Sequence, residues 1–134
     1  PEVEMEMVHS RLSQVGLRGN ENKYPSELSE GMKKRAALAR AMILGPEIIF
    51  CDEPAAGLDP ITANELDDLL IELKSLFGMT IVVVTHELRS IRKIADRAIV
   101  FHNNGLYFEG DLKALLALDD GFINRFFLKG KTNA

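Results

Sequence analysis

Two stretches decide the fold of this chain: Leu28-Ser29-Glu30-Gly31-Met32 and, twenty residues later, Ile48-Ile49-Phe50-Cys51-Asp52-Glu53. The first is a short Ser/Gly turn in front of a predicted helix. The second is an apolar run of strand length that ends in two adjacent carboxylates. Gly57-Leu58-Asp59 follows, and His86 comes directly after a second apolar run. This order predicts alternating helices and strands with polar groups at the strand ends.

Composition limits the class of protein. The chain has 134 residues, of which 46% are hydrophobic and 27% charged, so an ordered domain with a modest core is expected. The net charge is -4 and the one basic run is Lys33-Lys34-Arg35, which argues against nucleic acid as a partner. Cys51 is the single cysteine, which fits a reducing compartment. The chain begins at Pro1 within a charged helical pattern, so we expect it to be part of a longer protein.

Periodicity and breaker residues predict the order of the elements. Helices are expected at residues 3–15, 30–44, 60–77, 88–95, 112–118 and 122–128, and strands at 47–52, 80–85, 98–102 and 106–109. The last two strands flank the turn Asn103-Asn104-Gly105. This alternation predicts an α/β fold with a parallel sheet.

Burial follows from the same patterns. The strands at 47–52 and 80–85 are apolar throughout, so both faces of the sheet are expected to be covered. The helix after Asp59 carries one apolar stripe that is expected to be buried. The stripe consists of Leu66, Leu69, Leu70, Leu73, Leu76 and Phe77.

The carboxylates after the first strand predict phosphate chemistry. Asp52 and Glu53 leave a buried strand, and ligands of parallel sheets lie beyond the carboxyl ends of the strands. Asp52 could hold Mg²⁺ next to a polyphosphate, and Glu53 could orient and deprotonate an attacking water. His86 lies at the end of the next strand and could sense a γ-phosphate. The alternative is that acids end strands where the chain reaches solvent and that His86 is structural.

The starts of two predicted helices carry further candidates for contact with a nucleotide. Ser29 and Gly31 lie at a helix start, where backbone N–H groups and the helix dipole bind anions. The alternative for Ser29 is an ordinary N-cap. We expect Asp59 both to cap the helix that begins at Pro60 and to contribute to a subunit contact.

Several other residues could suggest a function, but we interpret them as ordinary structural residues. His9 and His102 lack a comparable setting, and Lys33-Lys34-Arg35 is expected to be a solvated helix face. Cys51 is expected to pack in the core. Gly130-Lys131-Thr132 looks like the end of a phosphate loop, but Arg125 stands where the earlier glycine would be needed.

In combination these motifs resemble the C-terminal half of an ABC transporter ATPase domain, over about 3–110. The stretch from Leu28 to Met32 resembles the ABC signature, and Ile48 to Glu53 resembles Walker B. Gly57-Leu58-Asp59, together with Ala56 before it, resembles the D-loop, and His86 resembles the switch histidine. The resemblance implies a P-loop NTPase-like three-layer fold with a mainly parallel sheet. This fold would be incomplete, because the Walker A half is missing from the chain.

A narrower resemblance is to the Mla/Mce-type phospholipid transport ATPases. It is carried by Tyr24 to Ser29 with Met32, by Asp59-Pro60-Ile61-Thr62 and by Val84 to Leu88. Glu30 departs from the family pattern, because the signature usually has glycine at this position. Its carboxylate would weaken phosphate binding unless it points away.

The resemblance also implies a domain layout, cofactors and partners. Residues 1–45 would form the signature helical region, 46–110 the core from Walker B to the switch histidine, and 111–134 the C-terminal helices. ATP and Mg²⁺ would be the cofactors, and a second ABC ATPase domain and a membrane permease subunit the partners. The location would be cytoplasmic, on the inner face of the cell membrane. The chain alone is expected to be inactive. A non-transport ABC ATPase and a non-enzymatic interaction module stay open as alternatives.

Overall fold

The computed structural model describes residues 1–129 of the chain. The chain forms two compact units, Pro1–Thr85 and His86–Ala134, and each is described by itself. Within the described residues, no helix is both long and apolar enough to span a membrane.

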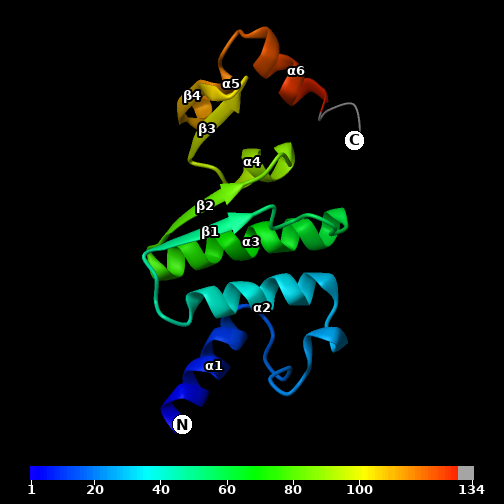
Figure 1. The fold of residues 1–134 in the computed structure, drawn as a ribbon, viewed down its shortest axis with the longest axis vertical. Coiled ribbons are helices and arrows are strands. Elements are labelled where there is room, and N and C mark those ends of the chain that lie inside the picture. Colours follow the sequence, from blue (N-terminus) through cyan, green and yellow to red (C-terminus); the bar gives the residue numbers. More distant parts are fainter. Residues whose placement is uncertain (130–134) are drawn as a thin grey trace. The chain divides into compact units, whose positions relative to one another are not determined.

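The first unit contains four helical segments and two strands (Figure 1). They are α1 (Glu2–Gln14), the 3₁₀ turn η1 (Pro25–Glu27), α2 (Glu30–Met42), β1 (Ile48–Asp52), α3 (Pro60–Phe77) and β2 (Thr80–Val84). The predicted helices and strands of this region are confirmed, although α2 ends two residues earlier than expected. Gly78 ends α3 in the left-handed conformation, at φ 61°, which glycine adopts without strain.

The first sheet consists of β1 and β2, which pair in parallel with Ile49 opposite Ile81 and Asp52 opposite Val84. α3 connects the two strands and lies along one face of the sheet (Figure 1). Ile49 is buried on that side. The expectation that both faces are covered is wrong for the described residues: on the other face Phe50 is 77% exposed and Val84 60%. Alternate residues of a strand point to opposite faces, and here one face has a helical cover.

The apolar stripe of α3 is buried over most of its length. Leu66, Leu69, Leu70 and Leu73 are all at most 5% exposed. The prediction is wrong for the last turn, where Leu76 is 64% exposed and Phe77 38%. Leu76 lies at the edge of the stripe, and the ring of Phe77 faces the guanidinium group of Arg11 at 5.1 Å. Cation–π contact therefore replaces core packing at this end of the helix.

The second unit contains a hairpin with three helices around it. Its elements are α4 (Leu88–Ile94), β3 (Arg97–His102), β4 (Gly105–Asp111), α5 (Leu112–Leu116) and α6 (Gly121–Lys129). β3 and β4 pair antiparallel, and the turn residues Asn103 and Asn104 have φ of 49° and 59°. Positive φ at both positions is the tight hairpin geometry that Asn-rich turns favour, as predicted. A small core forms from Leu112, Leu115, Ile123 and Phe127.

Candidate functional site

The ends of β1 and β2 are joined through Glu53. Its backbone N–H donates to the carbonyl oxygen of Val84 at 2.7 Å. The hydroxyl of Thr85 donates to Oε2 of Glu53 at 3.1 Å. The carboxylate of the predicted general base is therefore fixed beside the carboxyl end of the neighbouring strand, where parallel sheets bind ligands.

The backbone of Glu53 is unusual, because its φ is 45°. A residue other than glycine in this region stores conformational strain, and such strain concentrates at functional sites. Asp52, the last residue of β1, is exposed. Among the described residues no group of three or more His, Cys, Asp or Glu could hold a metal ion. Asp52 still fits Mg²⁺, which commonly binds through one or two carboxylates and the phosphates of a substrate.

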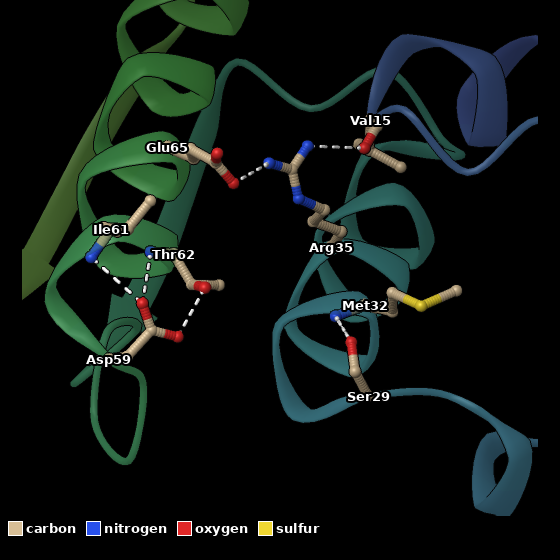
Figure 2. Close-up of polar contacts among 8 residues, drawn as sticks. All are labelled: Val15, Ser29, Met32, Arg35, Asp59, Ile61, Thr62 and Glu65. Atoms are coloured by element: carbon tan, nitrogen blue, oxygen red, sulfur yellow. Dashed lines mark hydrogen bonds and ion pairs between the residues drawn. The ribbon is translucent and has the colours of Figure 1, made fainter.

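The N-terminus of α2 is capped by Ser29, whose hydroxyl oxygen accepts the N–H of Met32 at 3.2 Å (Figure 2). The N-cap interpretation of Ser29 is confirmed. The first turn of a helix has four N–H groups without helical partners, and the hydroxyl engages one of them. Glu30 is exposed and accepts from Nζ of Lys33 at 2.9 Å, so its carboxylate is paired with a cation of its own helix.

The N-terminus of α3 is capped more fully, by Asp59. Oδ1 of Asp59 accepts the N–H groups of Ile61 and Thr62 at 3.0 and 2.9 Å, and Oδ2 accepts the hydroxyl of Thr62 at 2.6 Å (Figure 2). The predicted cap is confirmed. Hydrogen bonding, above all from the Thr62 side chain, lowers the pKa of Asp59, since each bond favours the ionised form.

Close packing joins the two capped helices. A Cβ atom added to the buried Gly31 would lie 2.7 Å from the Cγ2 methyl of Thr62. Arg35 of α2 donates to the carbonyl oxygen of Val15 at 3.0 Å and lies 3.9 Å from a carboxylate oxygen of Glu65 on α3 (Figure 2). The expectation of a solvated face is therefore wrong for Arg35, whose side chain ties α2 to its neighbours. The bond to Val15 spans twenty residues of sequence, so no local pattern could reveal it.

The remaining candidate residues have simpler settings. His86 is exposed and begins the second unit, directly after Thr85. Cys51 is half-buried, and burial raises the pKa of its thiol. His9 lies 3.4 Å from a carboxylate oxygen of Glu21, and His102 stacks on Phe122 with ring centres 3.9 Å apart.

Three further features lie away from these candidate residues. Gly130-Lys131-Thr132 lies outside the described residues. Asp67 of α3 is 1% exposed, and no pattern in the sequence predicts a buried carboxylate there. A shallow hollow of about 250 Å³ lies between α1 and α2 and is lined mainly by apolar side chains together with Arg11 and Arg40. None of the candidate nucleotide-binding residues lines this hollow.

Comparison with known proteins agrees with the motifs. Residues 2–56 match the family model described as ABC transporter. The chain is 40% identical over 126 residues to the "Probable ribonucleotide transport ATP-binding protein mkl" of Mycobacterium bovis, which covers 94% of this chain and 35% of that protein. It is 43% identical over 108 residues to the "Methionine import ATP-binding protein MetN 2" of Bacillus licheniformis, which covers 81% of this chain and 32% of that protein.

Solved structures of ABC transporter proteins are also similar to this chain. CbiO1 from Clostridium perfringens, part of the ABC transporter complex cbiONQ, aligns with a TM-score of 0.80 at 30% identity. That alignment covers 98% of this chain and 53% of cbiO1. MJ1267, an ATP-binding cassette of an ABC transporter in its ADP conformation, aligns with a TM-score of 0.83 at 26% identity over 96% of this chain and 51% of that one.

The expected P-loop NTPase-like α/β fold is thus confirmed. The chain spans about a third of the length of the curated relatives that it matches. Motifs, fold and relatives agree: the chain belongs to the ABC transporter family of ATP-binding proteins.

Proposed function

We propose that the complete protein that carries this chain is the ATP-hydrolysing subunit of an ABC transporter. The observation that carries the proposal is the setting of Glu53. It has a strained backbone at the end of β1, and its carboxylate is held by the hydroxyl of Thr85. A general base must be oriented before the reaction, so a carboxylate held in this way supports the proposed role of Glu53.

In the proposed reaction, Glu53 accepts a proton from a water molecule. The water oxygen forms a bond to the γ-phosphorus, and the bond from that phosphorus to the oxygen bridging to the β-phosphate breaks. Asp52 would hold Mg²⁺, which when bound neutralises charge on the phosphates. His86 would hydrogen-bond the γ-phosphate and so report its presence.

The other candidates would act across a contact with a second ABC ATPase domain. Ser29 and Gly31 would offer the N-terminus of α2 to the phosphates bound by the partner domain. Asp59 would take part in the subunit contact. The protein would work from the cytoplasmic face of the membrane against a permease subunit, as its place in this family supports.

For the transported substrate we propose a phospholipid. The support is the sequence signature formed by Tyr24 to Ser29 with Met32, by residues 59–62 and by residues 84–88, which resembles that of lipid-transport ATPases. The printed names of the relatives concern ribonucleotides and methionine, so these are the alternatives that an assay must include.

The test of the proposed reaction is Glu53→Gln in the complete protein, with Glu72→Gln as a matched control on an exposed part of α3. Removing a general base typically costs about 10²–10⁴-fold in turnover. We expect this loss of kcat for Glu53→Gln with ATP binding retained, and unchanged kcat for the control. Wild-type turnover in a well-folded Glu53→Gln variant would contradict the role of Glu53.

The substrate is tested with the protein and its permease in vesicles. We expect a labelled phospholipid to be moved in an ATP-dependent manner, and methionine and ribonucleotides to be left in place. ATP-driven movement of either of the latter without movement of lipid would refute the lipid proposal and leave the ATPase proposal intact.

A further inference from the structure

We propose that Thr62 is a positioning residue that links the turn at Gly31 to the carboxylate of Asp59. The link uses two atoms of one short side chain, a methyl group toward Gly31 and a hydroxyl group toward Asp59. This inference rests on the proposed function, in which both ends of the link face the nucleotide or the partner domain.

The methyl end of the link is a steric contact. Gly31 is buried in the first turn of α2, and a Cβ atom at this position would come within 2.7 Å of Cγ2 of Thr62. Real Cβ contacts are longer than this, so α2 can approach α3 here only because residue 31 is a glycine. Any movement of the Gly31 backbone toward α3 has to displace the Thr62 methyl group.

The hydroxyl end of the link is a hydrogen bond. Oγ1 of Thr62 donates to Oδ2 of Asp59 at 2.6 Å, and the backbone N–H of Thr62 donates to Oδ1 at 2.9 Å. Both carboxylate oxygens are therefore held by this one residue, and the N–H of Ile61 adds a third bond. The Thr62 hydroxyl is the side-chain donor among these three bonds, so the position of Oδ2 of Asp59 depends on where that hydroxyl points.

The two ends cannot move independently. Threonine is branched at Cβ, so a single rotation about χ1 carries the methyl and the hydroxyl together, and it has few staggered positions. Displacing the methyl by pressure from Gly31 turns the hydroxyl away from Asp59. A second tie, between Arg35 and Glu65 at 3.9 Å, joins the same two helices one turn further on.

The link would give the site a way to couple its two parts. Phosphate arriving at the N-terminus of α2 would shift Gly31, and Thr62 would transmit that shift to Asp59 at the subunit contact. Coupling of this kind needs a physically continuous set of contacts, and the path from Gly31 to Asp59 passes through one residue.

The experiment uses the complete protein with Thr62→Val, Thr62→Ser, Gly31→Ala and the double variant Gly31→Ala/Thr62→Ser. Valine keeps the methyl group and removes the hydroxyl, and serine does the reverse. We expect Gly31→Ala to lower the unfolding midpoint and the double variant to recover at least half of that loss. An equal loss for Gly31→Ala in both backgrounds would overturn the steric link.

A second measurement does not depend on whether Gly31→Ala folds. The pKa of Asp59 is followed by carbon NMR of its carboxyl group. We expect that pKa to rise toward its ordinary value in Thr62→Val and to stay low in Thr62→Ser. An unchanged pKa in Thr62→Val would overturn the hydroxyl link. General destabilisation would not raise the pKa of Asp59 in Thr62→Val and leave it low in Thr62→Ser.

The coupling itself is read from the same NMR signal with a Mg²⁺ complex of a non-hydrolysable ATP analogue. We expect the analogue to shift the Asp59 signal in the wild type and Thr62→Val to lose at least half of that shift at saturating analogue. A full shift in Thr62→Val would overturn the coupling. If the wild type did not bind the analogue, the proposed function would be refuted instead. The unfolding test and the Asp59 titration would then still decide whether Thr62 links Gly31 to Asp59.

Discussion

The N-termini of α2 and α3 are built alike but are capped to different degrees. Ser29 is neutral and accepts one N–H group, whereas Asp59 is charged and accepts two N–H groups and a hydroxyl. The positive end of the α3 dipole thus already faces a carboxylate from its own chain. The α2 end has a neutral cap, and the carboxylate in its first turn, Glu30, is paired with Lys33, so this end can still attract an external anion.

This difference bears on two residues that the sequence places alike, each at the start of a predicted helix. Ser29 stands at a helix end suited to phosphate. Asp59 uses both carboxylate oxygens on its own helix, which leaves the contact with a second subunit as its proposed role. The comparison supports the proposal that phosphate contact belongs to α2 and subunit contact to α3.

The change that should cost the most stability tests the packing of α3, the helix with the fuller cap. Leu73→Ala removes a side chain that is 1% exposed, and we expect a loss of about 2–5 kcal/mol in the free energy of unfolding. Leu76→Ala is the matched control on the same helix, 64% exposed, with an expected change within about 0.5 kcal/mol. Denaturant unfolding measures both. Equal losses would show that the packing of α3 is not as described.

Removing the two caps compares them directly. Ser29→Ala should cost about 1 kcal/mol in the free energy of unfolding, the usual value for one capping bond. Asp59→Ala should cost more, because three hydrogen bonds are lost instead of one. Ser75→Ala, an exposed position inside α3, serves as the control and should be neutral or slightly stabilising. A larger loss for Ser29→Ala than for Asp59→Ala would reverse the comparison.

The smallest effect is a difference in pH dependence. The lowered pKa of Asp59 means that its cap stabilises the fold fully above the unfolded pKa, about 3.9, and loses this effect as pH falls through the lower folded value. The stability difference between wild type and Asp59→Asn should therefore be constant near neutral pH and vanish in acid. The difference between wild type and Ser29→Ala should not depend on pH. Unfolding midpoints measured from pH 2 to pH 7 check both, and parallel curves would contradict the assignment.

Local patterns predicted what depends on local physics. The sequence predicts four such features: the capping residues Ser29 and Asp59, the end of α3 at Gly78 and the hairpin turn at Asn103-Asn104. Each of them follows from the bonds and φ values of a few adjacent residues.

Contacts between distant residues could not be predicted in this way. Arg35 looks like one of three solvated cations, and its bond to Val15 is visible only when α1 and α2 pack together. From the sequence, Thr62 is predicted to be an ordinary helix residue. Its close approach to Gly31 becomes visible only in the folded structure. Phe50 and Val84 belong to runs that predict burial on both faces, and which face receives a helix is a matter of topology rather than of composition.

The sharpest test of phosphate binding at the start of α2 is to give this helix end the kind of cap that α3 has. Ser29→Asp and Ser29→Asn differ by one charge and are both good caps. The affinity for Mg²⁺-ATP is measured for each in the complete protein, in the Glu53→Gln background so that ATP is not consumed. We predict that Ser29→Asn binds within a few-fold of its parent and that Ser29→Asp binds at least about tenfold more weakly, because like charges meet at the phosphate. Equal affinities of the two variants at equal stability would contradict the claim that phosphate is bound at the start of α2.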